Sequence, residues 1–146
     1  MSAGRKSRLR VLVMDDEDCI REMTEEVLEG LGFAADTVRD GSEAIRLFAH
    51  AAAAKEPYRA VILDRTVADG EGAMEILPRL KRIDPEVRAI ITSGYHNSPE
   101  MQQPGKYGFC ASLPKPWATV QLREILARAV ELPVAVEWMP TRDHLP

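Results

Sequence analysis

Apolar runs that stop abruptly at acidic residues are the feature that most constrains the fold of this chain. The run Leu9–Met14 ends at Asp15 and Asp16, and the run Ala60–Leu63 ends at Asp64. Runs with so little polar alternation are typical of strands buried on both faces, as in a parallel sheet. The pattern therefore predicts buried parallel strands that carry carboxylates at their carboxyl ends.

The rest of the chain repeats this alternation of strand and helix. Apolar residues recur at helical spacing between the runs, and Gly30, Gly32 and Asp84-Pro85 mark helix ends. The predicted strands are 9–14, 33–38, 60–63, 87–92 and 109–113, and the helical segments lie around 20–31, 42–54, 76–83, 98–105 and 122–129. Five strands alternating with five helices predict an α/β fold, a doubly wound parallel sheet with helices on both faces.

A length of 146 residues suits one domain with a real core. We expect a basic N-terminal arm over 1–8, a single domain over 9–132, and a tail or linker over 133–146, where three prolines break any periodicity. Cys19 and Cys110 are isolated in the sequence, and a buried free thiol is the expectation for each.

Charge and hydropathy exclude several classes of function. The net charge of −4 argues against nucleic acid as a partner. The start of the chain lacks the apolar segment of a secretory signal, and every apolar run is too short to span a membrane. We therefore expect a cytoplasmic protein that makes no membrane contact through this chain.

The chemistry is predicted where the strands end. Open parallel sheets bind ligands at the carboxyl ends of their strands, and there we find Asp15 and Asp16, Asp64, Ser93 and Lys115. Three neighbouring carboxylates repel one another unless a cation joins them, and an all-oxygen set favours Mg²⁺ (or Mn²⁺). With that charge compensated, one carboxylate can act as a nucleophile and form an aspartyl phosphate. The hydroxyl and the ammonium would then bind the phosphoryl oxygens.

These segments match four motifs of a known family. Met14-Asp15-Asp16-Glu17, Leu63-Asp64-Arg65-Thr66, Thr92-Ser93-Gly94-Tyr95 and Pro114-Lys115-Pro116 resemble the motifs of response-regulator receiver domains of two-component systems. The resemblance runs from about Leu9 to Leu132. In detail the chain is most similar to receivers of hybrid sensor histidine kinases, which implies that it is a fragment of such a kinase or a stand-alone relay protein.

The resemblance implies a flavodoxin-like receiver fold with strand order 2-1-3-4-5. It makes Asp64 the phosphoacceptor, taking a phosphoryl group from a phosphohistidine of a histidine kinase or phosphotransfer protein and switching a partner-binding face. Asp15, Asp16, Asp64 and the main-chain carbonyl of Thr66 correspond to the metal ligands. Ser93 and Lys115 match the family's hydroxyl and lysine positions, and the Lys115–Pro116 peptide is expected to be cis. Such a module is a monomer or weak dimer, and it is not an enzyme beyond phosphorylating and dephosphorylating itself.

Three positions bear on how the site is regulated. Ser112 stands where the family usually has Tyr or Phe, so the usual aromatic readout of phosphorylation is absent. Ala68 replaces a common proline, which predicts a less restricted loop. Tyr95 and Thr66 occupy the positions that modulate the lifetime of the aspartyl phosphate, and we expect the ring of Tyr95 to hinder attack by water.

Two alternatives remain at this point. A degenerate receiver would serve as a scaffold, although every site residue that the family needs is present. A haloacid-dehalogenase-like phosphatase is suggested faintly by Asp64-Arg65-Thr66, but that family places its nucleophile after the first strand and adds a cap insertion. A stoichiometric label at Asp64 distinguishes a receiver from both.

Overall fold

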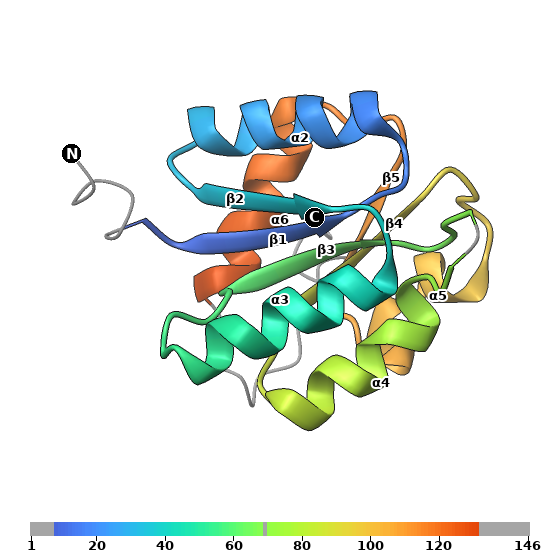
Figure 1. Ribbon diagram of the computed structural model, residues 1–146. Helices are drawn as coiled ribbons and strands as arrows, with labels where there is room; N and C mark the ends of the chain where they lie inside the picture. The colour runs from blue at the N-terminus through green and yellow to red at the C-terminus, as the bar shows by residue number, and fades with distance from the viewer. Residues whose placement is uncertain (1–7, 69, 132–146) are drawn as a thin grey trace.

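The protein is a five-stranded parallel sheet with helices on both of its faces, seen in a computed structural model that describes residues 8–68 and 70–131 (Figure 1). The strand order is β2-β1-β3-β4-β5, so the predicted doubly wound topology is confirmed. The strands are β1 (Arg10–Met14), β2 (Ala34–Val38), β3 (Ala60–Asp64), β4 (Ala89–Ser93) and β5 (Ala111–Pro114). The helices are α2 (Asp18–Gly30), α3 (Gly41–Ala53), α4 (Ala73–Ile83), α5 (Pro99–Gln102), the 3₁₀ helix η1 (Pro104–Tyr107) and α6 (Thr119–Glu131).

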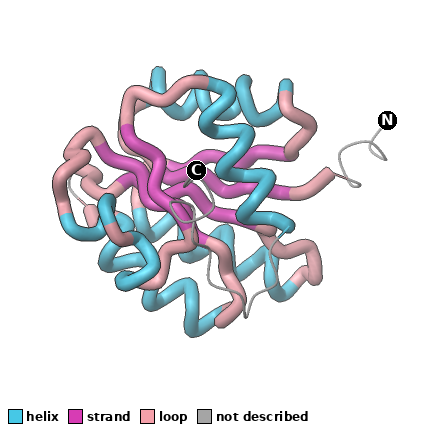
Figure 2. The backbone as a smooth tube through the Cα atoms, turned by 180° about the vertical axis from the view of Figure 1, so that it is seen from behind, coloured by secondary structure: helices cyan, strands magenta, loops and turns pink. Residues whose placement is uncertain are grey.

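The side chains of each central strand alternate between two cores. Leu12 and Met14 of β1 pack with α3 and α4, while Val11 and Val13 pack with α2 and α6. Figures 1 and 2 show these two helix layers on opposite faces of the sheet. Strands with an apolar helix layer on each side need apolar residues at every position, which explains the unbroken runs in the sequence.

The helix boundaries follow local chemistry. The carboxylate of Asp40 accepts a hydrogen bond from the Glu43 N–H at 3.0 Å, so Asp40 caps α3 rather than Ser42, where we expected the helix to open. Ser98 occupies the N-cap position of α5 before Pro99, but its hydroxyl donates to the Tyr95 carbonyl instead of capping the helix. The helix α5 is short because Pro104 begins a separate 3₁₀ turn.

Three smaller expectations have different outcomes. Cys19 is exposed, so the expectation of a buried thiol is wrong there; it lies in the first turn of the amphipathic helix α2, on the solvent side. Cys110 is half-buried, and burial raises its pKa to about 11. Trp117 is partly buried and packs against the core under α2 and α6. Most of the predicted arm (1–8) and all of the tail (133–146) lie outside the described residues.

Candidate functional site

Three strand ends place charged side chains on the same side of the sheet. Asp64 is the last residue of β3, while Asp15 and Lys115 directly follow β1 and β5. Each lies two positions after a core residue of the α2/α6 face. Because side chains alternate along a strand, all three point toward that same face. The prediction that these groups share one edge of the sheet is confirmed.

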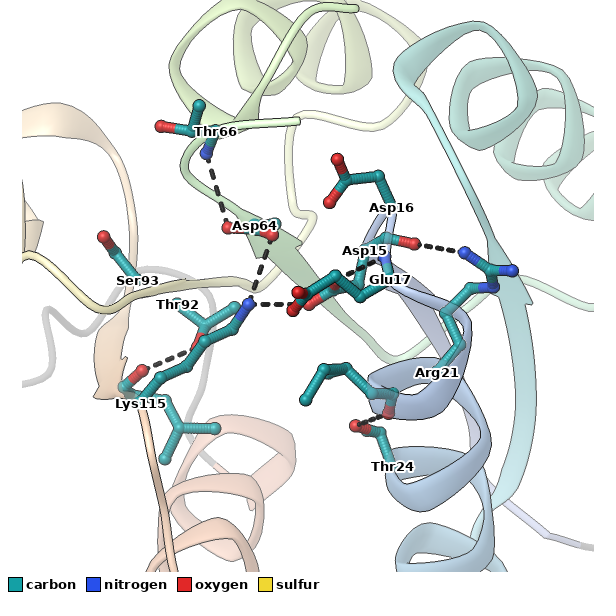
Figure 3. Close-up of polar contacts among 12 residues, drawn as sticks. Asp15, Asp16, Glu17, Arg21, Thr24, Asp64, Thr66, Thr92, Ser93 and Lys115 are labelled. Carbon is teal, nitrogen blue, oxygen red and sulfur yellow. Dashed lines mark hydrogen bonds and ion pairs between the residues drawn. The ribbon is translucent and has the colours of Figure 1, made fainter. Parts of the chain in front are cut away.

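The ammonium of Lys115 joins two of the carboxylates. Its Nζ lies 2.8 Å from Asp15 Oδ2 and 3.2 Å from Asp64 Oδ2. Figure 3 shows the lysine side chain reaching across from β5 with its nitrogen between the two acids. The second oxygen of Asp15 accepts a hydrogen bond from the Glu17 N–H at 3.0 Å, which holds the carboxylate in this orientation.

Asp16 and Thr66 complete the acidic edge. Asp16 Oδ2 accepts a hydrogen bond from the Ala68 N–H at 2.7 Å, which ties the β1–α2 loop to the loop after β3. The Thr66 N–H lies 3.3 Å from Asp64 Oδ1. One carboxylate oxygen from each of Asp15, Asp16 and Asp64 lies within 4.8 Å of the others, close enough for one ion to contact all three. This all-oxygen donor set fits a hard divalent cation such as Mg²⁺.

The electrostatics of the cluster are unbalanced. Burial raises the pKa of Asp64 from 3.8 to about 6, the charge of Lys115 opposes the rise, and the charge of Asp15 adds to it. Burial by itself would lower the pKa of Lys115, but its hydrogen bond to Asp15 and the two carboxylate charges raise it overall. Among the described residues of this cluster, three carboxylates face one ammonium. The surplus of negative charge favours binding of a cation.

Ser93 ends β4 with its side chain buried. Its Oγ accepts a hydrogen bond from the Tyr95 N–H at 2.9 Å, which leaves the hydroxyl hydrogen to be donated elsewhere. Tyr95 itself is 70% exposed, so its ring does not fill the site. Ser112 is half-buried and donates to the Met101 carbonyl at 2.7 Å, linking β5 to α5 where the family usually has an aromatic ring. The regulatory effects of Tyr95 and Ser112 stay predictions.

Gly72 lets α4 begin directly against the residue that follows Asp64. A Cβ at this position would overlap the main-chain carbonyl of Arg65, so this close approach requires glycine. The Gly72 N–H donates to the Glu75 carboxylate at 3.0 Å, which holds the start of the helix. The loop between β3 and α4 therefore starts and ends at the same place, with Gly72 packed against the Arg65 carbonyl.

One ion pair beside the site was not anticipated from the sequence. Arg65, the residue after Asp64, pairs through Nε with the carboxylate of Glu100 on α5. Glu100 is 5% exposed, and the hydrogen bond from Arg65 lowers its pKa. The partners lie far apart in sequence, and an isolated Glu after a proline carries no signal that it will be buried. The pair connects the backbone next to Asp64 to α5.

Comparison with known proteins gives a consistent result. The sequence model of the response regulator receiver domain matches residues 11–127. Sporulation initiation phosphotransferase F of Bacillus subtilis is 27% identical over 123 residues, covering 84% of this chain and 94% of that protein. The response regulator protein PilR of Pseudomonas aeruginosa is 29% identical over 126 residues, covering 86% of this chain but 27% of its own length.

Solved structures agree with the sequence matches. A response regulator receiver domain protein from Clostridium thermocellum superposes with a TM-score of 0.74 at 26% identity, covering 84% of this chain and 94% of that one. The receiver of a sensor histidine kinase from Pseudomonas aeruginosa, at 20% identity, shares the fold. The likeness to hybrid kinases is thus a minor part of the resemblance. Within the described residues, no helix is long and apolar enough to cross a membrane.

Proposed function

This chain belongs to the response regulator receiver domain family, and from that premise we propose that it accepts a phosphoryl group on Asp64 from a phosphohistidine of a histidine kinase or phosphotransfer protein. The observation that carries the proposal is the carboxylate cluster of Asp15, Asp16 and Asp64, with the ammonium of Lys115 in contact with two of its members. A histidine kinase partner is the ordinary one for receiver domains, and the particular kinase is left to experiment.

Each residue has a defined part in the proposed transfer. A carboxylate oxygen of Asp64 forms a bond to phosphorus as the phosphorus–nitrogen bond of the phosphohistidine breaks, and the bonding electrons leave with the imidazole. Lys115, already within 3.2 Å of Asp64, pairs with an incoming phosphoryl oxygen, and the Ser93 hydroxyl donates to another.

The carboxylates of Asp15, Asp16 and Asp64, with the main-chain carbonyl of Thr66, would hold Mg²⁺ or Mn²⁺. The fit rests on the spacing of the three carboxylate oxygens and on their surplus negative charge. When bound, the ion supplies positive charge against the phosphoryl oxygens. The hydrogen bond from the Ala68 N–H to Asp16 Oδ2 would restrain the side chain of this ligand.

The outcome of the transfer would be a stoichiometric modification. A receiver used in this way is consumed and regenerated once per phosphoryl group, so we do not expect steady turnover of a phosphoester. The chain covers about a quarter of the length of PilR, and output domains such as those of longer relatives are outside the proposal.

The test is to incubate the protein with acetyl phosphate and Mg²⁺ and to measure intact mass. We expect one phosphoryl group per chain in the wild type and none in Asp64→Asn. Asp18→Asn is the matched control, because Asp18 lies at the same end of the sheet but its side chain is 78% exposed and outside the cluster. Steady phosphoester hydrolysis would favour a phosphatase instead, and an unlabelled wild type would favour a scaffold.

A further inference from the structure

The loop between β4 and α5 contacts the main chain of Lys115 through one exposed side chain. His96 Nε2 lies 2.8 Å from the Lys115 carbonyl oxygen, across 19 positions of sequence. A carbonyl oxygen can accept a hydrogen bond but cannot donate one. The imidazole must therefore carry its hydrogen on Nε2, as it does in one neutral tautomer and in the imidazolium.

The main chain of Lys115 is held from two directions by one short segment. Its N–H donates to the Ser93 carbonyl at 2.9 Å, which extends the pairing of β4 with β5. Its carbonyl accepts from His96. The residue after Lys115 is Pro116, which has no N–H and cannot continue a ladder. The side chain of His96 thus holds the lysine backbone where the strand pairing ends.

This backbone position decides where the ammonium of Lys115 lies. The lysine side chain is long and flexible, so its Nζ can contact both Asp15 and Asp64 reproducibly when the backbone at its root is held still. In a transfer reaction, a small displacement of a charged group from its working position lowers the rate markedly.

We propose that His96 is a positioning residue for phosphoryl transfer, acting through the main chain of Lys115 without touching the phosphoryl group. The inference rests on the proposed function and adds a residue to it. The loop has other anchors, namely Tyr95 N–H to Ser93 Oγ at 2.9 Å and Ser98 Oγ to the Tyr95 carbonyl at 3.2 Å. Replacing the exposed imidazole of His96 therefore removes one hydrogen bond and leaves the loop attached.

The experiment compares three variants with the wild type for the rate of Asp64 phosphorylation by acetyl phosphate in Mg²⁺. His96→Leu removes the donor, and His96→Gln restores an amide N–H at a similar reach. His50→Leu is the matched control, because His50 is also an exposed histidine but lies in the last turn of α3. Free energy of unfolding and Mg²⁺ affinity are measured for each protein.

We expect His96→Leu to lower the rate at saturating acetyl phosphate by about three- to tenfold, the usual worth of one neutral hydrogen bond, with little change in half-saturating concentration. His96→Gln and His50→Leu should keep most of the wild-type rate. The free energy of unfolding should fall in His96→Leu by no more than one hydrogen bond contributes, and Mg²⁺ affinity should stay close to wild type in all three variants. The recovery of the rate in His96→Gln then separates positioning from a general structural effect.

Two results would overturn the inference while leaving the proposed function standing. One is a His96→Leu protein labelled as fast as the wild type, and the other is a His96→Gln protein as slow as His96→Leu. A wild type that takes no label at all would contradict the proposed function, and the role of His96 would fall with it.

Discussion

The two ends of the sheet both gather charged side chains, but they balance charge in different ways. Near the amino ends of β1 and β3, Arg10 lies 3.0 Å from the Asp36 carboxylate and 4.4 Å from the centre of the Tyr58 ring. The Tyr58 hydroxyl donates to Asp36 at 2.8 Å. Arg10 also lies 3.9 Å from the exposed carboxylate of Glu56, so the guanidinium is within ion-pair distance of both carboxylates at this balanced end.

The carboxyl ends of the strands have a different composition. Within the described part of the cluster, three carboxylates share one ammonium, and burial raises the pKa of Asp64 to about 6. The comparison teaches that Arg10 contacts each carboxylate of its group, whereas the three clustered carboxylates at the other end carry a larger surplus of negative charge, which a bound cation can relieve. If this is correct, changes at the two ends should separate stability from function.

The largest effect should come from the cation. We expect Mg²⁺ at about 100 times its dissociation constant to raise the free energy of unfolding by about 2.7 kcal/mol, because it binds the folded state alone. Asp15→Asn should lose most of this increment, while Asp36→Asn, at the balanced end, should keep it. Urea unfolding with and without Mg²⁺ measures both. An equal increment in Asp15→Asn would show that the cluster is not the cation site.

A smaller effect concerns Asp64 in the metal-free protein. Its pKa is raised from 3.8 to about 6, so the folded state keeps a proton that the unfolded chain releases at lower pH. The stabilisation is therefore complete below pH 3.8 and is lost as the pH rises through about 6. At pH 7.5 in EDTA we expect Asp64→Asn to be more stable than wild type by about 1–2 kcal/mol, allowing for water that reaches the site.

The control for this prediction is the pH profile itself. The advantage of Asp64→Asn in urea unfolding should shrink as the pH falls from about 6 toward 4, where the wild-type carboxyl is protonated in the folded protein. If Asp64→Asn is less stable than wild type at every pH, burial of the ionised Asp64 carboxylate does not destabilise the folded protein, and the prediction is wrong.

The smallest effect lies at the balanced end. Tyr58→Phe should lower the free energy of unfolding by about 1 kcal/mol, because it removes the hydrogen bond to Asp36. Burial and Asp36 raise the pKa of Tyr58 to about 12, so its contribution is present below pH 10 and is lost as the pH rises toward 12. An absorbance titration of tyrosine ionisation should lose the step near pH 12 in the variant, and the rate of Asp64 phosphorylation should be unchanged. Slower phosphorylation of Asp64 in Tyr58→Phe would show that the two ends of the sheet do not act independently.

The sequence predicted the sheet and the acidic edge well because both depend on local patterns. Buried strands leave continuous apolar runs, and parallel strands bring their carboxyl ends together, so Asp15, Asp64 and Lys115 were placed correctly from spacing alone. The strand order came from the family resemblance, and it is confirmed.

The contacts that the sequence did not predict are side-chain interactions between distant segments. Arg65 pairs with Glu100, and His96 binds the carbonyl of Lys115, yet neither pair has a spacing or periodicity that distinguishes it from solvated polar residues. The capping of α3 by Asp40 instead of Ser42 was also missed, since both residue types are good caps and the sequence does not distinguish them. Such choices depend on tertiary geometry, which one sequence does not record.

The close approach of Gly72 to Arg65 has a consequence for protein design. Because the segment after Asp64 returns to touch the chain where it left the sheet, its two ends are joined by contact and not by the length between them. Exposed residues of this segment, such as Glu71, can therefore be exchanged without changing the distance between its ends, at the cost in that case of the ion pair of Glu71 with Arg79. A side chain introduced at position 72 would overlap the Arg65 carbonyl. A redesign should therefore spare Gly72, and also Thr66 and Ala68, whose main-chain N–H groups contact Asp64 and Asp16.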